Sequence, residues 1–338
     1  GRPCAWAGVA TAINSATTKT IRNRIGSLPF FWCPNWSRPY LQVSGFGRRF
    51  LKALADRGLL SSLSAQSPGV RRLSSVNLNK AKRIVKKPLY RIYESRILKF
   101  LEPDKFPRHI GVIHDGHRRY ARAEGLPDYE ASYREGMKKF VEFLGWAEDL
   151  GIPAVTCWLL STENLERPEE ELEPYYDVLI DLFREIPEKV KGHDVSVKFV
   201  GSLDLLPQRL TDAAKILEGE CDRGSRRVTI ALAYGGRQEI VDAARELVGK
   251  LAEEGLSAEE IAERIDAAAL GASMYSPDLP DPDLVIRTSG ETRLSGFLLW
   301  QAAYAEFSFV DVYWPEFRRV DFLRAIRDYT HSTRRYGQ

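Results

Sequence analysis

The stretch HIGVIHDGHRRYAR, residues 109–122, passes from a short apolar run to a turn crowded with charge. The run HIGVI lies between Pro107 and Gly116, as expected for a buried strand that ends in a turn. The whole stretch holds an aspartate, three arginines and three of the five histidines of the chain. These residues fit a metal cluster, a phosphate-binding site or an ordinary strand with a polar end. Other parts of the sequence are needed to distinguish these three interpretations.

Similar apolar runs recur along the chain, separated by amphipathic patterns. The runs are PAVTCWLL at 153–160, VSVKFVG at 195–201, RVTIALAY at 227–234 and LVIRTS at 284–289. Apolar residues at helical spacing predict helices at 82–101, 133–151, 167–190, 204–219, 237–254, 257–270 and 321–335. Strands that are apolar on both faces and alternate with helices indicate an α/β fold, with an open, mainly parallel sheet flanked by helices.

Three local signals refine this prediction. Gly151 is a suitable residue to end the helix before it. Ser257 and Glu260 have the spacing of a capping box at the start of a helix. The segment GFLLWQAAYAEF, residues 296–307, is too apolar for a surface element, so we expect it to be buried.

Charge divides the chain into two parts. Residues 1–100 carry 19 Lys and Arg against 2 acids, a net +17, whereas residues 101–338 carry the other 30 basic and 44 acidic residues, a net −14. We expect residues 1–80 to be a basic extension that is either disordered or not part of the native protein, and residues 81–338 to be the functional domain. A basic arm attracts nucleic acid or anionic membranes. The acidic domain opposes a nucleic-acid partner, and no basic motif interleaved with aromatics supports one.

Cysteines and hydropathy indicate the compartment. The four scattered cysteines form no CxxC pair, which predicts reduced thiols. No uninterrupted apolar run is long enough to predict a membrane-spanning helix. We expect a cytoplasmic protein, and a peripheral contact with the membrane is left open.

Polar residues follow the predicted strands, where open parallel sheets bind their ligands. Gly116 permits a turn close to a ligand, and the arginines after it suit phosphate. Asp115 would repel a phosphate unless a cation such as Mg²⁺ lay between them. A turn with solvated arginines explains this motif equally well. The loop STENLERP, residues 161–168, offers hydrogen-bonding groups, and it also has the composition of a helix cap.

A second group of arginines follows the run at 284–289. Arg287, Arg293 and Ser295 predict another anion site. Glu306 lies within an apolar stretch, where a buried carboxylate needs a partner, either a metal or an arginine. Two anion sites, a carboxylate suited to a metal and abundant apolar surface together suggest a substrate with a diphosphate group and an apolar body.

Five ordered blocks of the sequence resemble the cis-prenyltransferases, the family that includes undecaprenyl diphosphate synthase. The blocks lie within about residues 107–338 and are HIGVIHDGHRRYAR, LLSTENLERP, AYGGRQEIV, DPDLVIRTSGETRLSGFLLWQAAYAEFSFVDVYWPEF and RRYG. The resemblance implies a homodimer with a hydrophobic tunnel between sheet and helices. It also implies that isopentenyl diphosphate and an allylic diphosphate, geranyl or farnesyl diphosphate, are condensed in cis geometry with Mg²⁺ as cofactor.

The resemblance also implies roles for individual residues. Asp115 would hold Mg²⁺ and assist the departure of the allylic diphosphate, and Asn164 would lie where a proton leaves isopentenyl diphosphate. Glu306 would be a second metal ligand, contributed across the dimer interface. The residues implied to bind the two substrates are Gly116, His117, Arg118, Arg119, Tyr120, Ser161, Thr162, Glu163, Leu165, Arg167, Arg287, Arg293, Leu294 and Ser295.

Several positions depart from the family's pattern. His117 replaces the usual asparagine after Asp-Gly, and we expect its charge to vary near neutral pH. His114 replaces the usual methionine, and Tyr133 stands where many members have a histidine. Leu159 stands where longer-chain enzymes tend to have a small residue, and its bulk would block elongation.

We therefore predict a short product, the fifteen-carbon Z,E-farnesyl diphosphate. The actinobacterial short-chain enzymes, whose motifs this sequence resembles, make this product. A long-chain decaprenyl or undecaprenyl diphosphate synthase and a non-catalytic partner subunit are the alternatives. A metal-dependent phosphohydrolase built on His114 and Asp115 would need more ligands downstream. Only His193 and His331 remain there, and neither follows a predicted strand.

Overall fold

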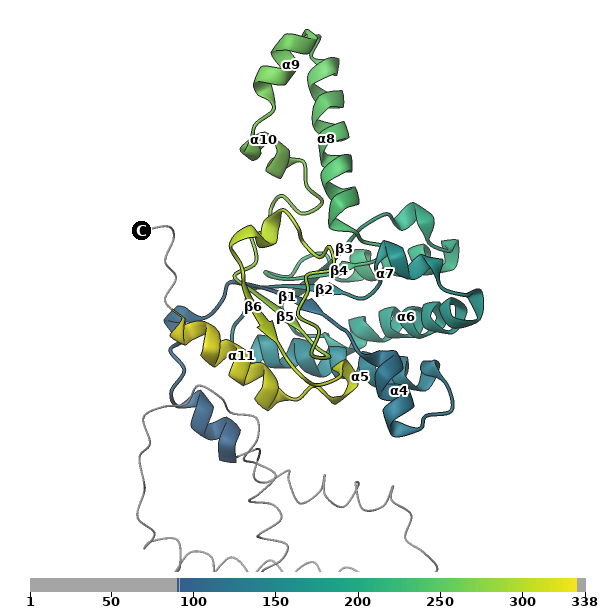
Figure 1. The fold of residues 1–338 in the computed structure, drawn as a ribbon, viewed down its shortest axis with the longest axis vertical. Coiled ribbons are helices and arrows are strands. Elements are labelled where there is room, and N and C mark those ends of the chain that lie inside the picture. Colours follow the sequence, from purple (N-terminus) through teal and green to yellow (C-terminus); the bar gives the residue numbers. More distant parts are fainter. Residues whose placement is uncertain (1–89, 91, 333–338) are drawn as a thin grey trace, which may run out of the picture. The chain divides into compact units, whose positions relative to one another are not determined.

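The computed structural model describes residue 90 and residues 92–332 (Figure 1), all within a compact unit that spans Lys80–Gln338. The extension expected over residues 1–80 lies outside the described residues. So does the first half of the helix predicted at 82–101, whereas residues 92–98 are helical.

In the part of the chain that the structure describes, one sheet of six parallel strands forms the centre of the fold. Its strand order is β3-β4-β2-β1-β5-β6, and every neighbouring pair is parallel. All residues of β1, β2 and β5 are buried, because both faces of the sheet are covered. This confirms the predicted open parallel sheet. The strands are β1 (His109–Ile113), β2 (Ala154–Trp158), β3 (Val195–Val200), β4 (Arg226–Ala231), β5 (Leu284–Arg287) and β6 (Glu306–Phe309).

Most of the described helices follow the predicted segments, but α4 was not predicted. The single helix predicted at 257–270 was wrong, because the chain breaks there into α9 and α10, with the Asp266 side chain accepting from Ala269 N–H at the start of α10. Gly151 adopts φ of 69° just after α5, and Ser257 and Glu260 form the predicted capping box at the start of α9. Helices α8, α9 and α10 extend away from the sheet as an arm (Figure 1). The described helices are α4 (His117–Glu124), α5 (Tyr129–Asp149), α6 (Glu169–Lys189), α7 (Gln208–Glu220), α8 (Gly236–Glu253), α9 (Ala258–Arg264), α10 (Ala267–Ala272) and α11 (Arg319–His331).

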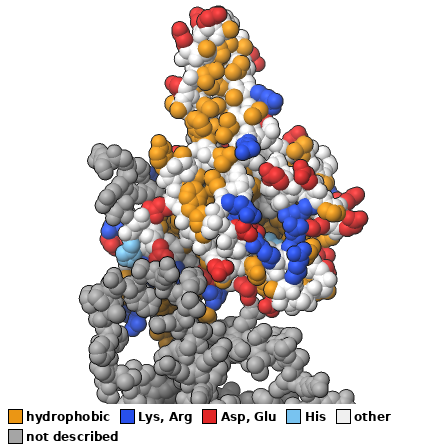
Figure 2. Space-filling model, in the orientation of Figure 1, with side chains coloured by type: hydrophobic (Ala, Val, Ile, Leu, Met, Phe, Trp, Pro, Cys, Tyr) orange, Lys and Arg blue, Asp and Glu red, His pale blue; other side chains and the backbone are white. Residues whose placement is uncertain are grey.

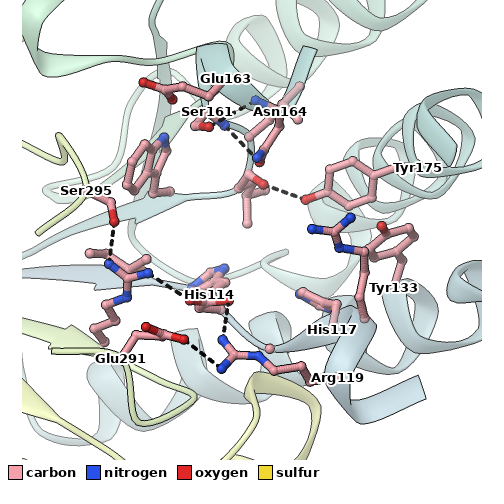
Figure 3. A pocket seen from close by; sticks show the side chains of 18 of the residues that line it. His114, His117, Arg119, Tyr133, Ser161, Glu163, Asn164, Tyr175, Glu291 and Ser295 are labelled. Atoms are coloured by element: carbon pink, nitrogen blue, oxygen red, sulfur yellow. Dashed lines mark hydrogen bonds and ion pairs between the residues drawn. The ribbon is translucent and has the colours of Figure 1, made fainter. Parts of the chain in front are cut away.

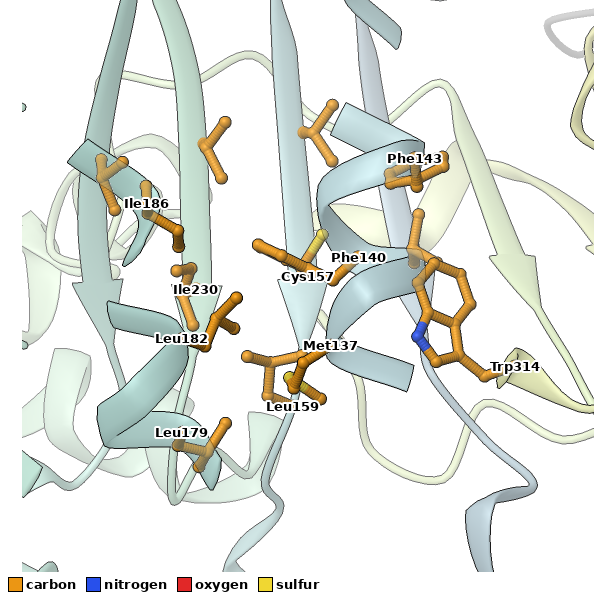
Figure 4. Packing of buried hydrophobic residues seen from close by; sticks show 14 of the residues in the cluster. Met137, Phe140, Phe143, Cys157, Leu159, Leu179, Leu182, Ile186, Ile230 and Trp314 are labelled. Carbon is orange, nitrogen blue, oxygen red and sulfur yellow. The ribbon is translucent and has the colours of Figure 1, made fainter. Parts of the chain in front are cut away.

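Hydrophobic side chains pack on both faces of the sheet. The larger core joins one face to α5, α6, α7 and α11. In Figure 4, Met137 of α5 and Leu179 of α6 lie beside Leu159, which directly follows β2. A smaller core on the other face includes Trp158 and Phe297, whose rings stack at 5.3 Å. The sheet therefore has the two covered faces that its apolar strands require.

The apolar segment at 296–307 is only partly buried, so the expectation that it avoids the surface was wrong for its second half. Phe297, Leu298 and Ala302 are buried, but Tyr304 is 80% exposed. Phe307 and Phe309 of β6 are also exposed, and their rings stack at 6.1 Å. The reason is that β6 is an edge strand of the sheet, with β5 as its one neighbouring strand among the described residues.

Candidate functional site

The carboxyl ends of three neighbouring strands form one pocket. Asp115 lies two residues after β1, Ser161 three residues after β2, and Arg287 is the last residue of β5. Because β1 pairs with both β2 and β5, these ends meet at one edge of the sheet. The pocket has a volume of about 710 Å³, and Figure 3 shows most of the side chains that line it.

Asp115 joins the two predicted anion sites. Its carboxylate accepts from Arg287 Nη2 at 2.9 Å and from Arg119 Nη2 at 3.3 Å. Burial by itself would raise the pKa of Asp115, but the hydrogen bond and charge of Arg287, with the charge of Arg119, lower that pKa overall. The Asp115 side chain keeps 27% of its surface exposed, so a ligand in the pocket can reach it.

Gly116 turns the chain from β1 into α4. Its φ is 112°, and a Cβ there would lie 2.8 Å from the Tyr313 ring, so only glycine fits. The first turn of α4 lines the pocket with His117, Arg118 and Arg119. A helix N-terminus with two guanidiniums is suited to an anion such as diphosphate.

His117 is buried in the wall of the pocket. Its Nδ1 lies 3.3 Å from the Ser132 carbonyl oxygen, and no partner among the described residues reaches its Nε2. Burial lowers the pKa of His117 to about 4, so the expectation that its charge varies near neutral pH was wrong. Gly136 of α5 makes room for the ring, because a Cβ at Gly136 would lie 2.0 Å from it.

The loop after β2 forms a helix cap, as one interpretation of the sequence predicted, and it also borders the pocket. Ser161 and Asn164 form a capping box on the 3-10 helix Thr162–Glu166, with Asn164 N–H donating to Ser161 Oγ at 3.2 Å. Ser161, Glu163 and Asn164 also line the pocket. The cap therefore fixes polar side chains where a substrate would contact them.

The loop after β5 completes the pocket. Arg287 donates to Ser295 Oγ at 2.7 Å and to the Arg293 carbonyl oxygen. Arg293 itself is 66% exposed and pairs with Glu291 at 2.6 Å. Only 6% of the Arg287 side chain is exposed, so Asp115 and this loop hold its guanidinium in a fixed position.

Five predicted site residues do not line this pocket. Tyr120 is buried, Thr162 packs against Gly235, and Leu165 and Leu294 pack against the two cores. The fifth, Glu306, begins β6 opposite Leu284, at the end of the sheet remote from Asp115. At about 3.3 Å per strand residue, the two carboxylates of one chain are separated by at least about 10 Å.

Several pocket residues escaped the sequence analysis. Glu291 is part of no recognisable pattern in the sequence. In the fold, its carboxylate accepts a hydrogen bond from Arg119 Nη1 at 2.8 Å. Glu171 of α6 does not line the pocket itself, but it pairs with two arginines that do, Arg167 at 3.2 Å and Arg118 at 3.5 Å. Tyr175 of α6 lines the pocket beside Leu159. Glu171 was visible in the sequence only as one of several acids in the first turn of a helix, where the helix dipole already explains it.

The donor set of the pocket suits Mg²⁺ bound together with phosphate. Among the described residues, no group of three or more His, Cys, Asp or Glu side chains lies together as a metal cage. Mg²⁺ often binds to one or two carboxylates and to substrate phosphates instead. Asp115, a partly exposed carboxylate between two arginines, has the chemistry for that role.

Comparisons with known proteins show the family to which the chain belongs. Residues 113–337 match the family described as "Putative undecaprenyl diphosphate synthase". The chain is 47% identical to a (2Z,6E)-farnesyl diphosphate synthase from Mycolicibacterium smegmatis, over 75% of this chain and 97% of that protein. It is 44% identical to a tritrans,polycis-undecaprenyl-diphosphate synthase (geranylgeranyl-diphosphate specific) from Methanopyrus kandleri, over 80% of this chain and all of that protein.

A solved structure is also similar. The crystal structure of lavandulyl diphosphate synthase from Lavandula x intermedia, in complex with dimethylallyl diphosphate, aligns with a TM-score of 0.65 and 32% identity. The alignment covers 70% of this chain and 100% of that structure.

Proposed function

The chain belongs to the undecaprenyl diphosphate synthase family of prenyltransferases, and from this premise we propose that it condenses isopentenyl diphosphate with an allylic diphosphate, geranyl or farnesyl diphosphate, to a short cis-prenyl diphosphate. The observation that carries the proposal is the Asp115 carboxylate shared by Arg119 and Arg287, which belong to two separate anion sites in one pocket. A reaction of two diphosphates needs such a pair of sites.

The reaction breaks the bond between C1 of the allylic substrate and its diphosphate, which leaves with the electron pair. The electron pair of the C3–C4 double bond of isopentenyl diphosphate forms the new bond between C1 and C4. A proton then leaves C2 to the departing diphosphate, and a double bond forms between C2 and C3. The first turn of α4, with Arg118 and Arg119, holds the departing diphosphate. Arg287, Arg293 and Ser295 hold the second diphosphate. Asn164 and Ser161 lie beside the carbon that loses its proton.

Mg²⁺ held by Asp115 would neutralise the charge that builds up on the leaving diphosphate. The arginines orient the two diphosphates, so that the reacting carbons approach each other. Asp115 and Glu291 keep the guanidiniums of Arg119 and Arg287 in place before a substrate binds. His117, neutral at physiological pH, supplies a hydrogen-bonding ring nitrogen in place of the family's amide.

A short product is supported by the wall of the pocket. Leu159 lines the pocket while packing into the larger core, as shown in Figure 4, so its side chain occupies space that a growing chain would need. The similar proteins include short-chain and long-chain enzymes at nearly equal identity. Product length therefore depends on such individual side chains.

A homodimer is supported by the exposed apolar surface. Tyr304, Phe307 and Phe309 are exposed at the edge strand β6, and Figure 2 shows further hydrophobic side chains along the arm of α8–α10. Two copies of β6 related by a two-fold axis would run antiparallel. The partner's Glu306 would then approach the carboxyl ends of this chain's strands, where Asp115 lies.

No helix among the described residues has the length and apolarity needed to cross a membrane. A cytoplasmic enzyme that touches the membrane peripherally, where an apolar product would partition, remains our proposal.

Product analysis tests the proposed function. The purified full chain with Mg²⁺ and labelled isopentenyl diphosphate should elongate geranyl or farnesyl diphosphate, and the product length is read by mass spectrometry. A chain that binds both diphosphates but gives no product with any allylic primer would be a non-catalytic partner subunit instead.

A further inference from the structure

One carboxylate outside the pocket pairs with two arginines that line it. Glu171 is in the first turn of α6, and its side chain is only 12% exposed. Its partners are Arg118 at 3.5 Å and Arg167 at 3.2 Å. Arg118 belongs to the first turn of α4, and Arg167 follows the 3-10 helix that carries Asn164. Glu171 therefore contacts the anion site of α4 and the loop after β2 at the same time.

A tyrosine of α5 fixes this carboxylate. The Tyr133 hydroxyl donates to Glu171 Oε1 at 3.1 Å. The Tyr133 ring is buried, and its centroid lies 4.4 Å from that of Tyr175, beside which it stands at one side of the pocket in Figure 3. Burial, followed by the charge of Glu171, raises the pKa of Tyr133, so the phenol keeps the proton that it donates. Glu171 therefore stays in place when an arginine leaves it.

The two arginines are held less firmly than Arg287. The Arg118 side chain is 46% exposed and that of Arg167 is 23% exposed, against 6% for Arg287. Ion pairs between partly exposed side chains are weak, and 3.5 Å is at the limit of hydrogen bonding. A diphosphate offers several charged oxygens, whose geometry suits guanidiniums. Both arginines can therefore be transferred from Glu171 to a diphosphate.

We propose that Glu171 competes with diphosphate for Arg118 and Arg167, and that this competition speeds the release of the pyrophosphate formed in each turnover. Glu171 does not line the pocket, so it is a positioning residue that acts through the two arginines. Tyr133 is a second positioning residue, because it anchors the carboxylate. The proposal rests on the proposed prenyl transfer, and it assigns the control of product release to a residue outside the pocket.

The physical reason is the charge of the leaving group. When the bond between C1 and the allylic oxygen breaks, the electron pair stays on the diphosphate, whose negative charge increases. The guanidiniums then bind it more strongly than they bound the substrate, which slows its departure. A carboxylate that remains within reach of both arginines takes them back, and its charge repels the anion. The site is thus restored for the next allylic substrate.

Titration with inorganic pyrophosphate tests the competition without any reaction. Glu171→Gln keeps the shape of the side chain and removes its charge. We expect this variant to bind pyrophosphate about fivefold more tightly than the wild type, in EDTA and with Mg²⁺ alike, which corresponds to one weak ion pair of about 1 kcal/mol. The gain in affinity from Mg²⁺ should equal that of the wild type. This distinguishes Glu171 from Asp115, whose replacement should abolish the gain.

Steady-state kinetics test the effect on turnover. Glu171→Gln should lower the KM for the allylic diphosphate and the inhibition constant of pyrophosphate by similar factors. It should also lower kcat, because pyrophosphate leaves more slowly. A residue needed only to hold the arginines in place would have the opposite effect, since its loss would raise KM and weaken pyrophosphate binding.

Glu169→Gln is the matched control, because Glu169 is an exposed acid of the same helical turn and does not line the pocket. It removes the same charge from the same turn, and it should bind pyrophosphate as the wild type does. Tyr133→Phe, which lacks only the hydroxyl that anchors Glu171, should increase the pyrophosphate affinity by a smaller factor. It carries the test if circular dichroism shows that Glu171→Gln does not fold.

A folded Glu171→Gln that binds pyrophosphate no more tightly than the wild type, or that has a raised KM, would overturn the proposal. Tighter binding with an unchanged kcat would overturn the role in release. If the wild type forms no product, the proposed function fails, and the pyrophosphate titration still decides whether Glu171 competes for the arginines. The two failures are therefore distinguishable.

Discussion

Replacing Asp115 with asparagine separates the two effects of this carboxylate on an anion. In the absence of Mg²⁺, Asp115 repels a diphosphate and also occupies Arg119 and Arg287, at 3.3 and 2.9 Å. With Mg²⁺, the same carboxylate attracts the complex of metal and diphosphate. Asp115→Asn should therefore bind inorganic pyrophosphate more tightly than the wild type in EDTA, and should lose the gain that Mg²⁺ gives.

The size of the effect follows from the exposure of the site. Unit charges about 4 Å apart interact by about 1 kcal/mol in water and about 4 kcal/mol at an effective dielectric constant near 20. The Asp115 side chain is 27% exposed, so its surroundings are intermediate between water and the protein interior. The interaction energy should therefore lie between these two values. We take about 2 kcal/mol, which corresponds to an affinity about 30-fold higher for Asp115→Asn in EDTA.

Calorimetric titration with pyrophosphate, with EDTA and with Mg²⁺, measures both affinities. The matched control is Asp104→Asn, an exposed aspartate of the 3-10 turn Pro103–Lys105, which should behave as the wild type. Equal pyrophosphate affinity of Asp115→Asn and wild type in EDTA, with equal gains from Mg²⁺, would refute the role we give to Asp115.

The difference in stability between the wild type and Asp115→Asn should depend on pH. Asp115 has a lowered pKa in the folded state, so its ion pairs stabilise the fold above its unfolded pKa of about 3.9. Asp115→Asn should melt a few degrees lower, since Arg287 loses its charged partner, at about 2–4 °C per kcal/mol. The difference should stay constant from neutral pH to about pH 4, and should vanish as the pH falls through the lowered pKa of Asp115.

Three further predictions concern product length and the dimer. Leu159→Ala should lengthen the product and lower the stability by about 2–5 kcal/mol, as read by mass spectrometry and chemical denaturation; an unchanged product would remove Leu159 as a determinant. Lysine at both Phe307 and Phe309 should convert a dimer to a monomer in light scattering at micromolar concentration, whereas a dimer that persists would show that β6 is not the interface. Glu306→Gln and Asp115→Asn, each inactive alone, should recover about a quarter of the wild-type activity when they are mixed and exchange subunits. Half of the dimers would then be mixed, and each mixed dimer would have one of its two sites intact. No recovery would exclude a site shared between the subunits.

The sequence predicted those parts of the fold that depend on near neighbours. The apolar runs that became β1, β2 and β5 and the capping box of Ser257 and Glu260 are local patterns, and each of them formed as expected. The position of Asp115 after a strand also followed from the order of residues alone. Local patterns succeed because backbone geometry and hydrogen-bonded caps involve residues a few positions apart.

The partners of these side chains required the tertiary structure. Asp115 and Arg287 are 172 positions apart, and they meet only because β1 and β5 are adjacent in the strand order. The exposure of Phe307 likewise depends on β6 lying at an edge, which no pattern within the strand reveals.

The sequence by itself determined most of the strands and helices, though not α4 or β6, and it determined which residues stand at the ends of the predicted strands. The folded arrangement decided that His117 is neutral, because burial within the wall of the pocket lowers its pKa, and that Tyr133 borders the pocket. Both properties arise from side chains brought together from distant segments. Burial and contact are properties of that packing, and they have no counterpart in the order of residues along the chain.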